Sequence, residues 1–222
     1  MTPPFLAYYG MINGDQDYLQ MAYDQCRLYR EAMLDPDVYL WQHVVLGPWQ
    51  DYGLWATGNA WAAAGMMRVH ATMRQSKFSS SFGEQMGDLG NWAAQITQQS
   101  WRYRNLTAGG LANYLGPNDT STFMDTASTA LMAATTYRLS QFGIDNSMIP
   151  YAEAGRAVVQ SMIDSSGWLA GAVDPITWTE ITRRSPEGQA FVLMMEAAWR
   201  DWQAASRTKI SRKRKRSLAP WR

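Results

Sequence analysis

The spacing of apolar residues along the chain predicts helices. Between residues 15 and 34, apolar and aromatic side chains recur at steps of three and four, which places them on one helical face: Tyr18, Ala22, Cys26, Tyr29 and Met33. Asp15 can cap this helix, and Pro36 follows its end. Two-residue alternation occurs only in short pieces near residues 39–45, so the pattern predicts an all-α protein.

Five further segments have the periodicity or the composition of helices. They cover residues 54–73, 84–106, 124–142, 150–163 and 185–202. The last begins with Ser185 and Pro186, a favourable start because proline has no N–H to leave unpaired in a first turn. Gly87 and Gly90 interrupt the segment 84–106. We expect about seven helices in all.

Three of the predicted helix starts resemble one another. Each has a small residue and a polar residue before an alanine and a large apolar residue: Gly58-Asn59-Ala60-Trp61, Ser128-Thr129-Ala130-Leu131 and Gly188-Gln189-Ala190-Phe191. The spacing of these motifs indicates a repeated helical hairpin with connections of variable length. Small residues at a helix start allow close packing, which a toroid of hairpins needs and a plain bundle needs equally.

Two predicted connections are unusually rich in aromatic residues. Residues 39–55 read YLWQHVVLGPWQDYGLW, and residues 167–180 read GWLAGAVDPITWTE. Loops are normally polar because they run over the surface. Sugar rings have apolar C–H faces that lie on Trp and Tyr, and their hydroxyls need polar partners, so such loops suit a sugar-binding cleft. Composition alone slightly favours the alternative that these side chains only cap the helical core.

The overall composition excludes several classes of protein. The chain has 222 residues, of which 46% are hydrophobic, 13% aromatic and 18% charged, so it can bury a core and is not disordered as a whole. Its one cysteine excludes a disulfide framework. No apolar run approaches the roughly 18 residues that span a bilayer, and no apolar leader follows Met1. We therefore expect no membrane partner, and the cellular location stays undetermined.

The basic residues are concentrated at the C-terminus. Residues 207–222 hold eight of the 20 Lys and Arg residues and no acid, so the remainder has 12 basic against 19 acidic residues and a formal charge of −7. An acidic body argues against nucleic acid as a partner. We divide the chain into a domain at residues 1–205 and a basic, disordered tail at residues 206–222. The run KRKR at residues 213–216 fits a nuclear-localisation pattern, although a solvated terminus is commoner.

Few single residues carry a chemical signal of their own. His43 could donate to an anionic or hydroxylated ligand, or could be an ordinary loop histidine. Asp51 in the same segment could be an acid–base group or a turn former, and Asp125 reads as a helix start. No cluster of His, Cys, Asp and Glu has the spacing of metal ligands, and no phosphate-binding loop occurs, so we expect neither a metal nor another cofactor.

Four segments together resemble one enzyme family. They are PPFLAYYG at residues 3–10, GLWATGNAWAAAGMMRV at 53–69, DTASTALMAATTYRL at 125–139 and SPEGQAFVLMMEAAWRDW at 185–202. The sequence resembles the unsaturated rhamnogalacturonyl hydrolases of glycoside hydrolase families 88 and 105, most of all their fungal members. The resemblance implies an (α/α)6 toroid of six hairpins. It also implies that the substrate is an unsaturated pectic oligosaccharide, hydrated at the C4–C5 double bond of its terminal uronic acid without a cofactor.

The resemblance also assigns residues to the site. It implies that His43 approaches the unsaturated uronate and that Trp55, Asn59 and Trp61 belong to the sugar-binding segment. Thr57 stands where bacterial members have an arginine for the uronate carboxylate, which puts the mode of carboxylate recognition in doubt.

In the resembled family, the catalytic Asp precedes the Pro-Pro-Phe-Leu motif by a few residues. Only Met1 and Thr2 precede Pro3 here, so we assign no catalytic residue and expect the chain to correspond to the C-terminal part of the toroid. Open edges of such a part predict self-association. Three functions remain as hypotheses: an enzyme acting on unsaturated pectic oligosaccharides, a catalytically inactive carbohydrate-binding remnant, and an unrelated helical interaction protein directed to the nucleus.

Overall fold

The protein is almost entirely helical, as the sequence predicts. The computed structural model describes residues 2–116 and 123–217, the side chains of 208–217 excepted. Over this part the helices are α1 (Thr2–Asn13), α2 (Gln16–Met33), α3 (Ala56–Gln75), α4 (Gly83–Arg102), α5 (Thr126–Phe142), α6 (Ile149–Ser161) and α7 (Pro186–Ser217), with a short 3-10 helix, η1 (Ser79–Ser81). The all-α prediction is confirmed.

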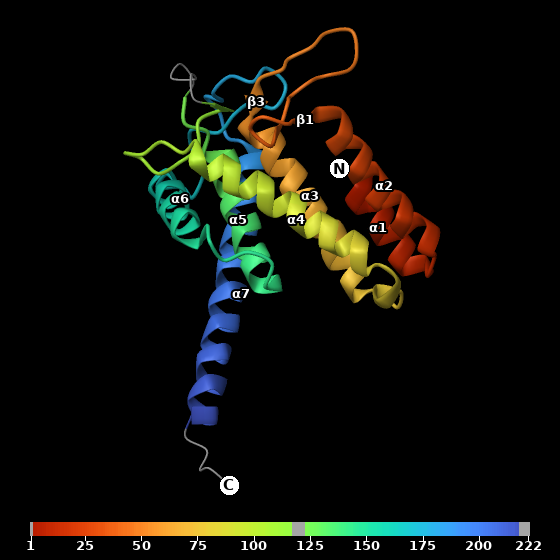
Figure 1. Cartoon of the computed structure of the whole chain (residues 1–222). Helices are drawn as coiled ribbons and strands as arrows, with labels where there is room; N and C mark the ends of the chain where they lie inside the picture. The colour runs from red at the N-terminus through yellow and green to blue at the C-terminus, as the bar shows by residue number, and fades with distance from the viewer. Residues whose placement is uncertain (1, 117–122, 218–222) are drawn as a thin grey trace.

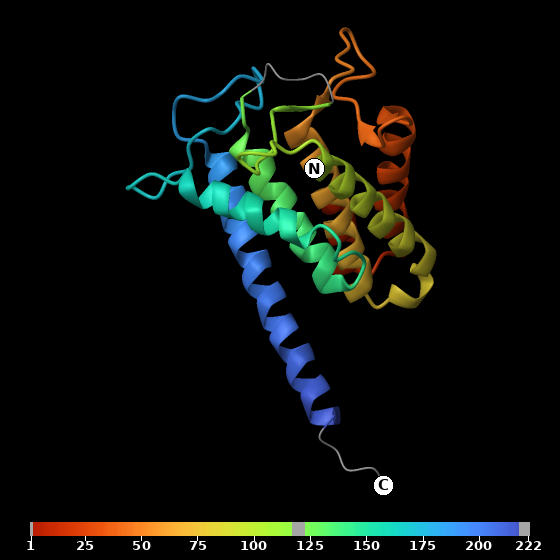
Figure 2. The same ribbon diagram turned by 60° about the vertical axis from the view of Figure 1, so that its left-hand side comes forward.

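The helices are arranged in two layers. α1, α3, α5 and α7 lie side by side in that order, and α2, α4 and α6 each pack against the helix that precedes them (Figures 1 and 2). The chain therefore forms three successive helical hairpins followed by α7. This is the repeated hairpin that the sequence predicts.

The long connections of the chain gather at one end of the helices (Figure 1). They join α2 to α3, α4 to α5 and α6 to α7. Two pairs of short antiparallel strands form within them: β1 (Leu34–Asp35) with β2 (Leu40–Trp41), and β3 (Leu54–Trp55) with β4 (Tyr114–Leu115). The helices thus hold three loops, far apart in sequence, beside one another.

The repeated motif lies at the start of α3, α5 and α7, at the end of the molecule where the long connections gather. Trp55, Asp125 and Ser185 are the residues directly before these helices, at equivalent positions of the repeat. Asp125 accepts hydrogen bonds from the N–H groups of Ala127 and Ser128, and the Ser185 hydroxyl accepts one from the Gly188 N–H. These side chains satisfy N–H groups that have no partner inside a helix.

Helix α5 forms the centre of the core. Most of its side chains are buried on every face, and many are small or hydroxylated. The hydroxyls of Thr135 and Thr136 donate to backbone carbonyls one turn earlier, so burial leaves neither unpaired. The Trp101 indole of α4 donates to Thr136, and a Cβ at Gly155 of α6 would lie only 2.7 Å from that indole. Only glycine allows α6 to approach so closely.

Two regions differ from the sequence-based expectation. Periodicity misses α1 because nearly all of its positions are apolar or aromatic, which leaves no polar face to contrast. The backbone of α7 continues to Ser217, whereas we expected disorder from residue 206. Lys and Arg in this stretch favour helix, and residues 218–222 lie outside the described part. The division of the chain at residue 205 stays a prediction.

Helix α1 exposes an apolar face, and we predict that it causes self-association. Phe5, Tyr8 and Ile12 are 64%, 56% and 63% exposed. A contiguous patch of this kind is unusual on a soluble monomer. Light scattering coupled to size exclusion should detect species larger than a monomer, and Phe5→Ser with Ile12→Ser should reduce them.

The matched control is Leu106→Ser, because Leu106 is 83% exposed but lies in a connecting loop outside α1. This variant should leave the size distribution unchanged. A monodisperse wild-type monomer that melts cooperatively and reversibly would contradict the prediction.

Candidate functional site

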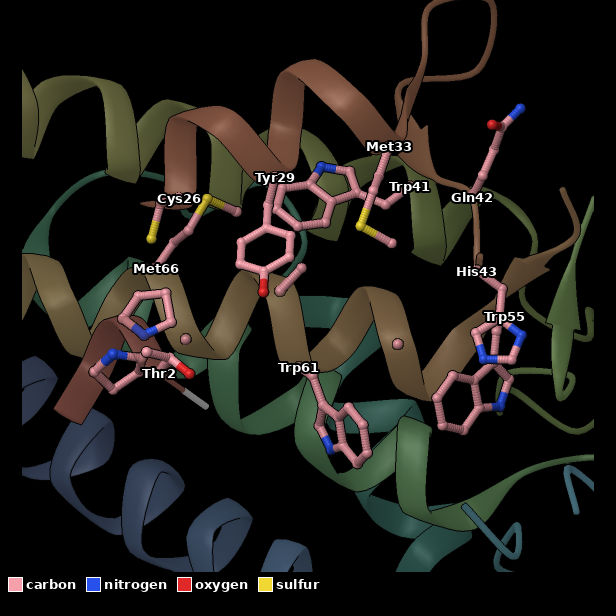
Figure 3. A pocket seen from close by; sticks show the side chains of 15 residues that line it. Thr2, Cys26, Tyr29, Met33, Trp41, Gln42, His43, Trp55, Trp61 and Met66 are labelled. Atoms are coloured by element: carbon pink, nitrogen blue, oxygen red, sulfur yellow. The ribbon is translucent and has the colours of Figure 1, made fainter. Parts of the chain in front are cut away.

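An open groove runs between α1, α2 and α3 and ends at the connection from α2 to α3 (Figure 3). Its volume is about 460 Å³. One end is lined by Thr2, Cys26 and Met66, and the other by His43 and Trp55. Cys26 is buried, as the sequence predicts, and burial raises the pKa of its thiol to about 12. The polar and aromatic chemistry therefore lies at the end formed by His43.

His43 and Asp51 meet because their loop folds back on itself. Val44 and Asp51 exchange two backbone hydrogen bonds of 2.7 and 2.8 Å, and the His43 N–H donates to the Gly53 carbonyl. This pairing brings the His43 Nδ1 atom 2.8 Å from Asp51 Oδ2. Only a tenth of the His43 side chain is exposed.

Tyr114 joins this pair from a different connection. The pairing of β3 with β4 places Tyr114 opposite Trp55. Its hydroxyl donates to Asp51 Oδ2 at 2.7 Å and lies 3.2 Å from His43 Nδ1. The histidine is therefore oriented by a carboxylate that the tyrosine also contacts.

The partners of Asp51 determine its charge. Burial would raise its pKa, but hydrogen bonds from Tyr114, His43 and the Gly53 N–H outweigh burial and lower it. Asp51 is thus ionised at neutral pH. Because a carboxylate can only accept, the proton of this hydrogen bond lies on His43 Nδ1. The Nε2 atom has no hydrogen-bond partner within residues 2–116 and 123–207, so it is available to a ligand in the groove.

Aromatic rings surround His43. Its ring centroid lies 4.7 Å from that of Trp55, 5.2 Å from that of Trp178 and 6.1 Å from that of Trp49. Trp55 in turn meets Trp61 edge to face at 5.4 Å. We call these five residues the aromatic cluster. Trp178 has a φ of 56°, a strained conformation for a bulky residue that Asn113 supports by donating to the Trp178 carbonyl.

The structure separates the five residues expected to bind sugar into two groups. His43, Trp55 and Trp61 line the groove, and Trp61 is 39% exposed. Thr57 and Asn59 are buried beneath it. Asn59 accepts from the Trp41 N–H and donates to the carbonyls of Trp41 and Trp55. Contact with a sugar stays a prediction for all five.

Asp125 is completely buried and holds three parts of the chain together. Its oxygens accept hydrogen bonds from the Thr57 hydroxyl at 2.6 Å and from the backbone N–H groups of Ala127, Ser128 and Val173. Burial raises its pKa, and these hydrogen bonds oppose the rise. The polar atoms of Thr57 are thus used inside the protein, as a link between α3 and α5.

Glu187, in the first turn of α7, is the second carboxyl near the site. Burial and the charge of Asp125 raise its pKa to about 7, the charge of Asp174 adds to the rise, and hydrogen bonding to the Trp61 side chain opposes it. Neither of its oxygens accepts a hydrogen bond of regular geometry within the part of the chain that the structure describes. A carboxyl with such a pKa beside a cleft is a candidate for function.

Sequence reasoning missed Tyr114, Asn113 and Glu187. The first two meet His43 and Trp178 only through the pairing of connections that are far apart in sequence, so no local pattern marks them. Glu187 offers a weak signal, because it precedes the third copy of the repeated motif as Thr57 precedes the first.

The described residues contain no group of three His, Cys, Asp or Glu side chains that could hold a metal ion. They also contain no helix long and apolar enough to cross a bilayer. What the arrangement offers a ligand is a set of aromatic faces, one oriented histidine and one buried carboxyl.

Solved structures of carbohydrate-processing enzymes share this fold. A possible member of the GH105 family from Salmonella enterica serovar Paratyphi A matches 90% of the chain with a TM-score of 0.77 and 16% identity. A family 88 glycosyl hydrolase from Bacteroides vulgatus matches 90% with a TM-score of 0.74 and 16% identity. The unsaturated glucuronyl hydrolase from Bacillus sp. GL1 matches 89% with a TM-score of 0.67 and 15% identity.

The match covers 54%, 60% and 56% of those three structures, so the chain spans little more than half of their length. No model of a protein family and no curated protein matches the sequence. At such low identity the likeness establishes the fold, that of the six-hairpin glycosidases, and not the reaction.

Proposed function

We propose that the chain is a glycoside hydrolase-like protein whose groove binds the unsaturated uronic acid at the non-reducing end of pectic oligosaccharides. The observation that carries the proposal is the groove end where His43, oriented by Asp51 and Tyr114, lies among the rings of the aromatic cluster. The shared fold supports it, since the neighbour from Bacillus sp. GL1 is an unsaturated glucuronyl hydrolase.

The geometry matches what such a sugar requires. Trp61 offers an exposed ring face for the apolar side of a pyranose. The His43 Nε2 atom can exchange a hydrogen bond with a hydroxyl or the uronate, because Asp51 fixes the proton on Nδ1. Thr57 and Asn59 support the groove wall from beneath through their buried hydrogen bonds.

Hydration of the C4–C5 double bond needs a group that protonates the vinyl ether and a water molecule that adds to it. The resembled family uses an aspartate for the first step, and we assign that role to no residue described here. The proposal therefore concerns recognition of the sugar first and turnover second.

An unsaturated galacturonyl–rhamnose disaccharide tests both parts. We expect calorimetry to detect binding, and the ultraviolet absorbance of the C4–C5 double bond to fall little or not at all. The saturated disaccharide is the control for recognition of the unsaturated ring. Robust loss of absorbance would show that an unassigned acid completes the reaction, and absence of binding would overturn the proposal.

The second candidate is a catalytically inactive carbohydrate-binding protein. The observation that favours it is that Glu187, the carboxyl with the raised pKa, has both oxygens shielded from solvent in this structure. Binding of the disaccharide without loss of the C4–C5 absorbance would support it.

A further inference from the structure

The groove continues well beyond the aromatic cluster. From His43 it runs along α3 toward Thr2 at the start of α1, and its other wall comes from α2 and β2 (Figure 3). The proposed sugar site uses only the end formed by His43, so the remainder is left for whatever is attached to the sugar. We call this remainder the apolar arm; its main lining residues are Cys26, Tyr29, Met33, Trp41, Gly65 and Met66.

The apolar arm offers a ligand little hydrogen bonding. Among the described residues that line it, only Thr2 and Tyr29 carry a hydroxyl. The indole N–H of Trp41 is shielded from solvent, and the buried Cys26 thiol is a weak donor. A second sugar carries several hydroxyls, and each one that loses water without gaining a partner costs affinity. The arm therefore favours a group without hydroxyls.

The side chains of the arm suit a flat aromatic ring. Tyr29 is 47% exposed and Trp41 lines the same wall, so a second ring can stack or pack edge to face on an aromatic surface. Met33 and Met66 contribute thioethers, which contact aromatic rings favourably and adapt to their shape. Figure 3 shows Tyr29, Trp41 and Met33 extending from α2 and β2 along the same stretch of the groove.

Gly65 deepens the floor of the arm in the middle of α3. Glycine is less favourable there than alanine, because it has more conformational freedom to lose. The packing of the chain does not require it, since the nearest atom to a Cβ at this position would be Pro4 Cγ at 3.9 Å. At Gly58, by contrast, a Cβ would lie 2.9 Å from the Trp55 ring. The space above Gly65 is therefore explained by a ligand and not by a neighbouring side chain.

We propose that the apolar arm binds an aryl aglycone, a single aromatic ring attached to the anomeric carbon of the uronic acid. This inference rests on the proposed function, which places the uronate at the His43 end, and the arm is continuous with that end. The whole groove, of about 460 Å³, has the size of a site for such a ligand. The arm thus selects phenolic glycosides of the unsaturated uronate over those in which a second sugar follows it.

The test is calorimetry of the full chain with three ligands that carry the same unsaturated uronate. They are its 4-nitrophenyl glycoside, its methyl glycoside and the unsaturated galacturonyl–rhamnose disaccharide. Because one aromatic ring becomes buried, the dissociation constant of the 4-nitrophenyl glycoside should be about tenfold lower than that of the methyl glycoside. It should also be lower than that of the disaccharide.

Gly65→Leu should remove this preference, because its side chain fills the arm. It should bind the 4-nitrophenyl glycoside no more tightly than the methyl glycoside, whose affinity should match that of wild type. Gly87→Leu is the matched control: Gly87 also lies inside a helix, α4, with no atom from elsewhere in the chain within 4 Å of its Cβ position, and it does not line the groove. It should keep the wild-type preference. Because leucine favours helix, neither variant should melt below wild type.

Tyr29→Ser tests the wall of the arm without adding volume. Its ring is half exposed, so truncation removes little of the core and the variant should fold. The preference for the 4-nitrophenyl glycoside should shrink, and the affinity for the methyl glycoside should not change.

The possible failures are distinguishable. If wild type binds the 4-nitrophenyl and methyl glycosides equally well, the sugar site stands and the aglycone site is overturned. If the disaccharide binds as tightly as the 4-nitrophenyl glycoside, the arm takes a sugar and its preference for an aromatic ring is overturned. A preference that both Gly65→Leu and Tyr29→Ser retain would place the ring outside the arm. If none of the three ligands binds, the proposed function fails and the inference fails with it.

Discussion

Replacing Asp125 with alanine is expected to lower the stability of the protein more than any other single change near the groove. The carboxylate is completely buried and accepts four hydrogen bonds. Its removal leaves the Thr57 hydroxyl and the N–H groups of Ala127, Ser128 and Val173 buried without that partner. We expect the free energy of unfolding to fall by about 3–5 kcal/mol. That corresponds to about 6–20 °C in Tm for a chain of this size.

Asp15→Ala separates this effect from the loss of a helix cap. Asp15 caps α2 through one hydrogen bond from the Asp17 N–H in an exposed position. Its replacement should cost about 0.5–2 kcal/mol. Chemical denaturation of both variants measures the difference. Equal losses would mean that Asp125 is only a cap and does not join α3, α5 and the connection that holds Val173.

Asp125→Asn should lower the free energy of unfolding by an intermediate amount. Its one remaining oxygen can still accept hydrogen bonds, but its new NH2 group faces donors and cannot accept from them. In both variants hydrogen exchange should accelerate at Val173, whose N–H loses its partner.

The pH dependence of stability offers a further check, through Glu187. Without the charge of Asp125 its pKa should fall from about 7, so the pH dependence of stability in Asp125→Ala should shift to lower pH.

The sequence predicts the helices to the extent that each shows two different faces. α2 has a polar and an apolar side, and its predicted limits agree with Gln16–Met33 to within a residue or two. The predicted segment 84–106 overruns α4, which ends at Arg102, because the aromatic and apolar residues of the following loop continue the pattern. α1 has no polar face at all, so periodicity cannot detect it.

The candidate site is predictable only in part, for a different reason. His43 stands out because aromatic residues surround it in sequence, and the structure keeps it among them. Tyr114 and Glu187 reach the site through pairing and packing across 59 residues or more, which no local pattern contains. A resemblance in sequence places Thr57 and Asn59 near the groove but says nothing of their burial, because burial depends on Asp125 and Trp41.

Replacing Trp61 with alanine is expected to produce the largest loss of sugar affinity. Its ring is the most exposed of the three tryptophans that line the groove, so truncation removes a binding face and little of the core. Ring stacking and buried apolar area together contribute about 1–3 kcal/mol. The dissociation constant for the unsaturated disaccharide should therefore rise between about fivefold and about a hundredfold. Trp61→Phe should lose less, since it keeps a smaller face.

Trp168→Ala is the matched control, because the Trp168 ring lies under Arg184 and outside the groove. Calorimetry is the appropriate measurement, since removing an indole alters fluorescence whether or not the sugar binds. The titration belongs at about pH 6, where Glu187 carries its proton and the variant differs from wild type only in the ring. An unchanged dissociation constant for Trp61→Ala would place the sugar elsewhere.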